Sequence, residues 1–283
     1  MRILLTGAKG QLGSCFQDRL PAGWDVWATD ADVLDITDLA KVKSAVVDYR
    51  PNVIVNAAAF TAVDKAETDH KIAALINEIG PKNLALAANE VGARLVHVST
   101  DYVFDGEATT PYIETAPTKP LGVYGKTKLD GEIAVSHHQP DALIIRTAWV
   151  FSEYGKNFVK TMLKLAQDHD NLGVVSDQFG CPTYAGDIAQ AIIDLLQREA
   201  AGGIYHFCGD ETVTWSEFAE AIFSSAIKQG FLARAPMVNG IRTSEYPTPA
   251  KRPKYSVLNC EKIKSQGVLL SPWKIRLDDM MVK

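Results

Sequence analysis

The sequence lacks several features that would point to a compartment or a partner. Its four cysteines, at positions 15, 181, 208 and 260, form no CxxC pair and show no metal-ligand spacing, which indicates reduced thiols. No apolar run approaches the roughly 20 residues of a membrane span, and the first one is too short for a secretory signal. The net charge is −5 without a long basic run, which argues against nucleic acid or an anionic membrane as the main partner. We therefore expect a cytoplasmic protein of ordinary globular composition.

The first half of the chain alternates short apolar runs with longer amphipathic stretches. The apolar runs read RILLT, WDVWATD, NVIVNAAA, RLVHVST and ALIIRTAWV. The stretches between them are typical of helices and cover residues 11–20, 38–50, 70–91 and 123–137. Continuous apolar strands alternating with helices predict an α/β fold, with a Rossmann-type doubly wound parallel sheet covered on both faces.

The second half is less regular. Helical patterns cover residues 156–169 and 185–199, and a third helix follows Thr214, a plausible N-cap with Glu217 as its capping-box partner. After residue 231 the chain looks loop-like.

These patterns predict two unequal lobes. We expect a dinucleotide-binding domain over residues 1–150, with residues 172–208 partly returning to it. Residues 151–171 and 209–283 should form mainly a smaller C-terminal substrate-binding lobe.

Gly7, Gly10 and Gly13 follow the first predicted strand in LLTGAKGQLG. Glycines here let the backbone turn tightly and approach a pyrophosphate. A turn without a ligand would also use glycine, but the place in the first βαβ unit favours dinucleotide binding. Asp30 ends the second strand and can accept hydrogen bonds from both adenosine ribose hydroxyls, unless it only caps a turn. Its charge would repel a 2′-phosphate, so NADH is favoured over NADPH.

Tyr124 is the only tyrosine with a lysine, Lys128, four residues later. On a helix the two side chains share a face, and the lysine charge would lower the pKa of the phenol toward neutrality. Such a phenol is a usable acid, but the motif alone also arises by chance. Thr100 ends the neighbouring strand and could hold the same substrate oxygen; the alternative is a turn residue bonding its own backbone.

Together these features resemble the extended short-chain dehydrogenase/reductase superfamily. Within it, the chain resembles the dTDP-4-dehydrorhamnose reductase family through motifs that run in order: NAAAFTAVDKAE, VHVSTDYVFDG, PLGVYGKTKLDGE, RTAWVF, DQFGCPT and YPTPAKRPKYSVLN. The resemblance implies that NADH or NADPH delivers hydride to C4 of dTDP-4-dehydro-L-rhamnose, the last step of dTDP-rhamnose biosynthesis for cell-surface polysaccharide. Tyr124 would protonate the C4 oxygen, Lys128 would hold the nicotinamide ribose and Thr100 would position the ketone.

The same resemblance, together with the glycine loop and the chemistry of Arg252, gives two sets of expected contacts. The cofactor set is Gly7, Gly10, Gln11, Leu12, Gly13, Asp30, Asp35, Ile36, Ala57, Ala59, Phe60, Thr61, Tyr124 and Lys128. The substrate set for the nucleotide sugar is Val63, Thr100, Asp101, Trp149 and Arg252. Trp149 could instead belong to the core, and Arg252, which suits a bidentate phosphate contact, could be a surface arginine.

The chain departs from the family at one site. Some members bind magnesium through glutamates at a dimer contact, and the matching positions here are Cys15 and Gly186. Neither side chain offers the oxygen ligand that Mg²⁺ needs. We therefore predict no metal, and any homodimer would lack a magnesium bridge.

Related functions share parts of this pattern: a 6-deoxy-talose-forming reductase, an epimerase, a 4,6-dehydratase, and a non-catalytic NADP-binding regulatory subunit. A dehydratase typically has Glu after the Asp that follows the catalytic threonine, whereas Tyr102 follows Asp101 here. The complete set of Thr100, Tyr124 and Lys128 argues against a regulatory subunit. C4 stereochemistry, base specificity, cofactor preference and oligomeric state stay open.

Overall fold

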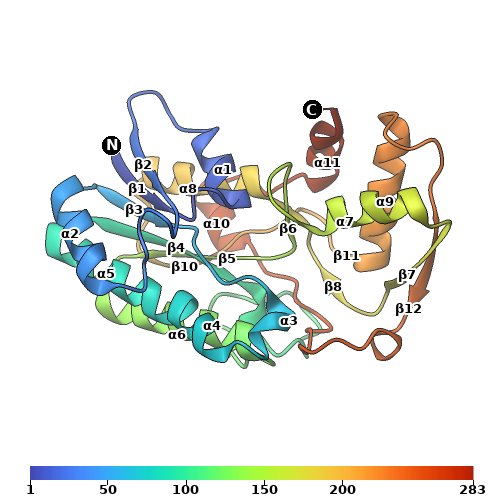
Figure 1. Ribbon diagram of the computed structural model, residues 1–283, viewed down its shortest axis with the longest axis horizontal. Helices are drawn as coiled ribbons and strands as arrows, with labels where there is room; N and C mark the ends of the chain where they lie inside the picture. The colour runs from blue at the N-terminus through green and yellow to red at the C-terminus, as the bar shows by residue number, and fades with distance from the viewer. Residues whose placement is uncertain (283) are drawn as a thin grey trace.

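The computed structural model describes residues 1–282, and its main body is a six-stranded parallel sheet with strand order β10-β5-β4-β3-β1-β2 (Figure 1). The strands are β1 (Arg2–Thr6), β2 (Asp25–Thr29), β3 (Val53–Asn56), β4 (Arg94–Thr100), β5 (Leu143–Thr147) and β10 (Gly203–His206). Helices cover both faces, so the predicted α/β fold with a doubly wound parallel sheet is confirmed.

The two faces of the sheet bury different side chains because successive residues of a strand point to opposite sides. Ile3 and Leu5 belong to the core beneath one set of helices, and Leu4 belongs to the core beneath the other. The first set is α1 (Gln11–Gln17), α8 (Ala185–Gln197) and α10 (Glu261–Ser265). The second is α2 (Leu39–Tyr49), α5 (Gly80–Val91) and α6 (Val123–His138). Double burial explains why these strands read as continuous apolar runs.

The order of the strands reverses at β1. The chain runs from β1 outward to the edge strand β2 and then returns to β3 on the other side of β1. Thr6 and Asn56 end these two strands, and the Thr6 hydroxyl donates to Asn56 Oδ1 at 2.8 Å. Open α/β sheets bind ligands at the carboxyl ends of strands beside such a reversal, and here the glycine loop lies at that place.

The remaining elements form a second group around an aromatic core that includes Phe151, Phe218 and Trp273 (right in Figure 1). Its helices are α7 (Phe158–Asp168), α9 (Trp215–Lys228) and α11 (Trp273–Val282). Its short strand pairs are β6 (Val150–Phe151) with β9 (Thr183–Tyr184), β7 (Asn171–Val175) with β12 (Met237–Ile241), and β8 (Phe179–Gly180) with β11 (Val213–Thr214). The predicted capping box between Thr214 and Glu217 is confirmed at the start of α9.

Two predictions about secondary structure are wrong in part. The region after residue 231 is not only loop, because it contains β12, α10 and α11. In α11 the buried Trp273, Leu277 and Met281 recur every four residues, a helical spacing that charged neighbours obscure in the sequence. The single helix expected over 70–91 is three segments: α4 (His70–Ala74), a π-helical turn (Leu75–Ile79) and α5.

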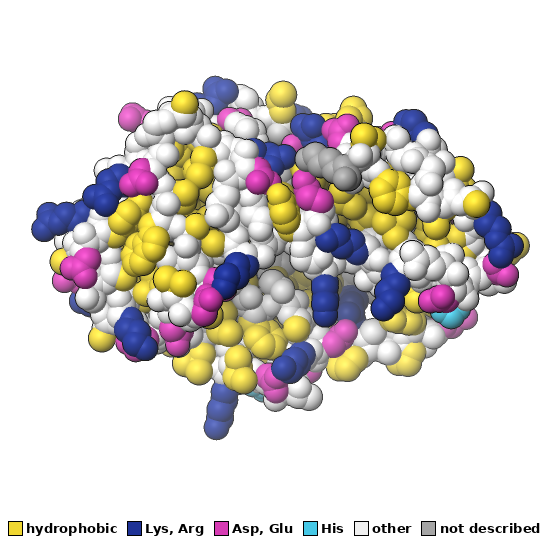
Figure 2. All heavy atoms as spheres, turned by 45° about the horizontal axis from the view of Figure 1, so that its top comes forward, with side chains coloured by type: hydrophobic (Ala, Val, Ile, Leu, Met, Phe, Trp, Pro, Cys, Tyr) yellow, Lys and Arg dark blue, Asp and Glu magenta, His cyan; other side chains and the backbone are white. Residues whose placement is uncertain are grey.

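Three short elements complete the description: α3 (Val63–Ala66) and 3₁₀ turns over Asp101–Val103 and Thr243–Glu245. None of the helices described for residues 1–282 is long and apolar enough to cross a membrane. Acidic and basic side chains are interspersed over most of the face in Figure 2, and the surface is hollowed between its left and right parts.

Candidate active site

A cleft of about 900 Å³ opens at the carboxyl ends of β1, β3, β4 and β5. Its volume is within the range of small-molecule sites. Of the residues predicted to contact a cofactor, those that line the cleft are Gly7, Gly10, Gln11, Leu12, Asp30, Asp35, Ile36, Ala57, Ala59, Thr61, Tyr124 and Lys128. Gly13 and Phe60 do not line the cleft, because both make packing or hydrogen-bond contacts elsewhere.

The glycine loop packs so tightly that side chains are excluded at two of its three glycines. Gly7 has φ +70°, and a Cβ there would lie 2.6 Å from Ala58 N. A Cβ on Gly13 would lie 2.2 Å from the Gly7 carbonyl oxygen, so Gly13 serves the packing of α1 against the loop rather than the cleft. A Cβ on Gly10 would meet the same oxygen at 3.2 Å, a closer approach than usual but a much milder one. The loop therefore presents mainly backbone to the cleft, which fits a pyrophosphate.

Phe60 contributes its backbone to a different contact. The Phe60 N–H donates to Asn77 Oδ1 at 2.8 Å, and Asn77 Nδ2 donates to the Phe60 carbonyl at 3.1 Å. Asn77 Nδ2 also donates to the Thr127 hydroxyl at 3.2 Å, one residue before Lys128 on α6. Asn77 lies in the π-helical turn, a feature often found at functional sites, and it ties the loop after β3 to the helix that carries Tyr124. Asn77 could not be predicted from the sequence, because helical periodicity does not reveal a single π-turn.

Asp30 is oriented by two backbone groups beside the cleft. Its Oδ2 accepts from Lys9 N at 3.0 Å, and its Oδ1 accepts from Ala31 N at 2.9 Å. Each oxygen keeps a lone pair for a ribose hydroxyl, so the site fits the adenosine end of a dinucleotide. Lys9 Nζ pairs with Asp32 at 2.6 Å on the surface. This cation beside Asp30 was not among the predicted residues, and it could also meet a 2′-phosphate.

Tyr124 and Lys128 lie one turn apart on α6, as predicted, and both line the cleft. Lys128 is buried, and its ammonium donates to the Val98 carbonyl of β4 at 2.6 Å. Burial lowers the pKa of Lys128 to about 8, although the negative charge of Glu132 acts to raise it. The ring of Tyr102 meets the Tyr124 ring edge-on, with centroids 5.4 Å apart.

The predicted lowering of the Tyr124 pKa is wrong in this structure. Loss of hydration at the cleft wall raises the pKa of Tyr124 to about 12; the Thr100 hydroxyl favours the ionised phenol, and Asp101 disfavours it. Lys128 has no part in this shift because its ammonium is directed to the Val98 carbonyl. Tyr124 therefore holds its proton at neutral pH, which is the state that a proton donor needs.

Two buried oxygens near Tyr124 lack a hydrogen-bond partner within residues 1–282: Asp101 Oδ2 and the Thr147 hydroxyl. Asp101 is 2% exposed; its Oδ1 accepts from the Thr100 hydroxyl at 3.0 Å, and burial raises its pKa to about 6. Thr147 lines the cleft and pairs in register with Thr100 on the neighbouring strand. Unpaired buried oxygens are costly, which points to a ligand at this place. Thr147 could have been found from the sequence, because it ends a parallel strand just as Thr100 does.

Two of the predicted substrate residues, Trp149 and Arg252, are held by contacts within the protein. Trp149 has φ +47° and stacks on Trp215 with centroids 3.5 Å apart, and it is half-buried rather than part of the closed core. Arg252 binds Asp64 of α3 with both guanidinium arms, at 2.8 and 3.1 Å. Val63 precedes Asp64, so these contacts join the loop before Tyr255 to the first residues of α3. None of the three lines the 900 Å³ cleft, and neither do Thr100 and Asp101. The Thr100 hydroxyl accepts from Tyr102 N at 3.2 Å, which is the backbone turn contact expected as the alternative role of this residue.

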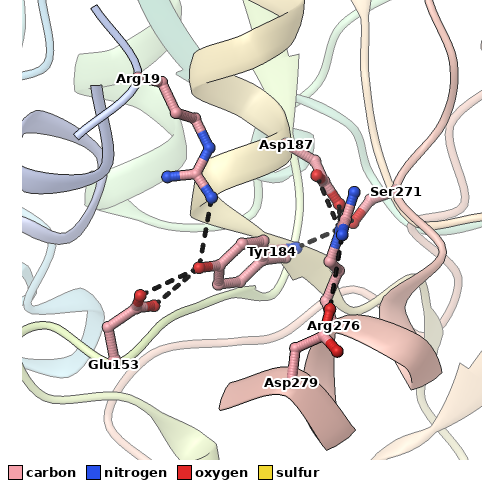
Figure 3. Close-up of polar contacts among 7 residues, drawn as sticks. All are labelled: Arg19, Glu153, Tyr184, Asp187, Ser271, Arg276 and Asp279. Atoms are coloured by element: carbon pink, nitrogen blue, oxygen red, sulfur yellow. Dashed lines mark hydrogen bonds and ion pairs between the residues drawn. The ribbon is translucent and has the colours of Figure 1, made fainter. Parts of the chain in front are cut away.

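The positions matching the family's magnesium ligands do not fit that ion. Burial raises the pKa of the Cys15 thiol to about 12, and a Cβ on Gly186 would lie 2.2 Å from Arg19 Nη2. Figure 3 shows the Arg19 guanidinium directed to the Tyr184 hydroxyl, which also faces Glu153. A guanidinium therefore lies where a cation would have to bind. Within residues 1–282, no three His, Cys, Asp or Glu side chains are grouped as metal ligands.

The family model described as RmlD substrate binding domain matches residues 1–283 of the sequence. The chain belongs to this family. A dTDP-4-dehydrorhamnose reductase of Aggregatibacter actinomycetemcomitans is 46% identical over 99% of the chain and 98% of that relative. The crystal structure of a dTDP-4-dehydrorhamnose reductase from Clostridium acetobutylicum has a TM-score of 0.94 at 43% identity, covering 99% of this chain and 98% of that one.

A further solved family member bears on the cofactor. The reductase of Bacillus anthracis, crystallised in complex with NADP, has a TM-score of 0.93 at 37% identity and covers 99% of this chain and 98% of its own. Because these matches extend over the whole chain, the cleft at the glycine loop is the place where a nicotinamide cofactor would bind.

Proposed function

We propose that the chain reduces the C4 ketone of dTDP-4-dehydro-L-rhamnose to dTDP-L-rhamnose with NADH or NADPH, the last step of dTDP-rhamnose biosynthesis. One observation carries the proposal: Tyr124, Lys128 and the glycine loop line a single cleft in a chain that matches named reductases over its whole length. When bound, the nicotinamide cofactor supplies the hydride.

Tyr124 donates the proton to the C4 oxygen. The high pKa of its phenol keeps the proton in place until charge develops on the substrate oxygen, when the transfer becomes favourable. Thr100 orients that oxygen, and the unpaired Thr147 hydroxyl offers a further hydrogen bond beside it. Lys128 holds the nicotinamide ribose through its ammonium, which is kept at the cleft wall by its hydrogen bond to the Val98 carbonyl.

The remaining predicted residues complete the two sets of contacts. Asp101, with its unpaired Oδ2, accepts a hydrogen bond from a sugar hydroxyl, and Trp149 and Val63 contact the nucleotide sugar. Arg252 contacts the diphosphate while it shares its guanidinium with Asp64. We also propose that the protein acts in the cytoplasm and that any homodimer forms without a magnesium bridge.

A specific contact favours a reductase over a 4,6-dehydratase. Water elimination would need a glutamate after Asp101, and Tyr102 stands there, packed edge-on against Tyr124. No carboxylate from this position can act on the substrate.

The test is reduction of the ketosugar itself. Purified protein is mixed with dTDP-4-dehydro-L-rhamnose and either cofactor, oxidation is followed at the nicotinamide absorbance, and the product is identified by NMR. Tyr124→Phe should lose about 10²–10⁴-fold in turnover and keep its affinity for the cofactor. A wild-type protein that oxidises neither cofactor with this ketosugar would refute the proposal, and a C4 epimer as product would redirect it to a 6-deoxy-talose-forming reductase.

A further inference from the structure

The loop over residues 152–157 reaches from the second group of elements to the glycine loop. The Ser152 hydroxyl and Asn157 Nδ2 both donate to Gln11 Oε1, at 3.0 and 2.9 Å. Gln11 Nε2 donates in turn to the Val150 carbonyl at 3.5 Å. Because Gln11 begins α1 directly after Gly10, these bonds hold the loop beside the predicted pyrophosphate site.

The other side of the loop is held as well. The Tyr154 hydroxyl donates to Asp18, the residue that follows α1, at 2.7 Å. The Tyr184 hydroxyl donates to Glu153 at 2.9 Å (Figure 3). Contacts on both sides fix the loop's position, so its cleft-facing residues are presented in a defined place.

Gly155 and Lys156 are the loop residues that line the cleft. Gly155 has φ +60°, and a Cβ there would lie 3.2 Å from Gln11 Cγ, so the turn of the loop lies against Gln11. Lys156 comes next, is exposed, and makes no hydrogen bond or ion pair with any residue in the described part of the chain.

The other two lysines that line the cleft are engaged. Lys9 is paired with Asp32, and Lys128 donates to the Val98 carbonyl. Lys156 is thus the cleft lysine without a partner among residues 1–282, whereas Lys9 would have to share its charge with Asp32 in order to meet an anion.

The charge of the cofactor makes this lysine useful. A dinucleotide carries two negative charges on its pyrophosphate, and the predicted contacts Gly10, Gln11 and Leu12 bring no positive side chain. Asp30 and Asp35 add negative charge to the same cleft. We propose that Lys156 binds the pyrophosphate of the nicotinamide cofactor and that the loop over residues 152–157 is the strap that holds it there. This inference rests on the proposed use of NADH or NADPH.

Binding measurements test the inference without turnover. Dissociation constants of NADH, NADPH, ADP-ribose and adenosine are measured by calorimetry at low ionic strength, because salt screens an exposed charge. Lys156→Gln should weaken binding of the first three by about five- to tenfold and leave adenosine unchanged. Lys156→Arg should restore most of the loss. Lys164→Gln is the matched control, since Lys164 is exposed on the nearby α7 and does not line the cleft.

Several outcomes would overturn the inference. Equal affinities of Lys156→Gln and wild type would show that the ammonium contacts no phosphate. A loss confined to NADPH would move the contact to the 2′-phosphate, and an equal loss for adenosine or for the Lys164 control would indicate a general change rather than a pyrophosphate contact. A wild-type protein that binds no dinucleotide would instead contradict the proposed function itself.

Discussion

Glu132 and Arg146 form a buried ion pair beneath the active site. The substitution Glu132→Gln tests how much this pair contributes to the free energy of unfolding. Each side chain is 3% exposed, and the guanidinium donates to the two carboxylate oxygens at 2.9 and 2.7 Å. The Ser99 hydroxyl donates to the same carboxylate, and Arg146 also contacts His206 Nε2 at 3.4 Å. Burial lowers the pKa of His206 to about 3, so this neighbour is neutral and adds no second positive charge beside Arg146.

The magnitude follows from burial. Glutamine keeps the shape of the side chain but leaves the Arg146 charge without a counter-charge in the interior, which costs about 3–5 kcal/mol of unfolding free energy. The same pair at the surface would be worth less than about 1 kcal/mol. Replacing both partners, as in Glu132→Met with Arg146→Met, removes the unpaired charge and should return the protein to within about 2 kcal/mol of wild type.

Urea unfolding at pH 7.5, followed by circular dichroism and tryptophan fluorescence, measures these differences. Superimposable curves from the two probes are required before a single free energy is quoted. A loss below about 1 kcal/mol for Glu132→Gln, or a double variant less stable than both single variants, would refute the reasoning.

The same substitution has a consequence for catalysis. The Glu132 carboxylate lies one helical turn from Lys128 and raises its pKa, against the lowering by burial. Removing that charge should lower the pKa of Lys128 below about 8 and move the alkaline fall of the pH–rate profile to lower pH. An unchanged profile would show that Glu132 serves stability alone.

Three further predictions concern the cleft. For the wild type, the rate of ketosugar reduction should fall as pH rises through about 8, because Lys128 loses its proton there, and a flat pH–rate profile to pH 10 would contradict this. Gly13→Ala should lower the free energy of unfolding in urea by more than about 2 kcal/mol and weaken cofactor binding, because the added Cβ would lie 2.2 Å from the Gly7 oxygen. Gly10→Ala should have a smaller effect, because its Cβ would lie 3.2 Å from the same oxygen. Thr147→Val removes an unpaired hydroxyl, so unfolding free energy should stay equal or rise by about 1 kcal/mol while KM for the ketosugar increases; an unchanged KM would mean that the hydroxyl meets no substrate.

Much of the fold could be predicted because the sheet is buried on both faces. Each strand then reads as an apolar run, and the carboxyl-end rule brings Gly7, Thr100 and Tyr124 toward one edge. The elements after residue 231 were missed because β12 buries none of its residues and α11 carries charges between its buried positions. The two-lobe division stays a prediction.

Within the site, spacing identified which side chains meet but not their electrostatics. The YxxxK motif predicts a shared helical face, and Tyr124 and Lys128 do share one. It does not reveal that the Lys128 ammonium is directed to the Val98 carbonyl, or that loss of hydration dominates the pKa of the phenol. The pKa of a side chain depends on how deeply it is buried and on its hydrogen-bond partners, and a linear motif records neither.

The ion pair and the cleft differ in how their buried polar groups are satisfied. Beneath the sheet edge, the buried charges of Glu132 and Arg146 are matched by partners within the protein. At the edge itself, Asp101 Oδ2 and the Thr147 hydroxyl are buried without one among residues 1–282. Two further buried groups without a partner in this part of the chain, His97 Nε2 and Trp273 Nε1, lie outside the cleft lining, so an unpaired group alone does not mark a site. At the cleft, a bound ligand can supply the missing hydrogen bond and so offset the cost of the unpaired Thr147 hydroxyl. On this argument the ketosugar should stabilise the wild type more than it stabilises Thr147→Val, and thermal unfolding with and without ligand would measure that difference.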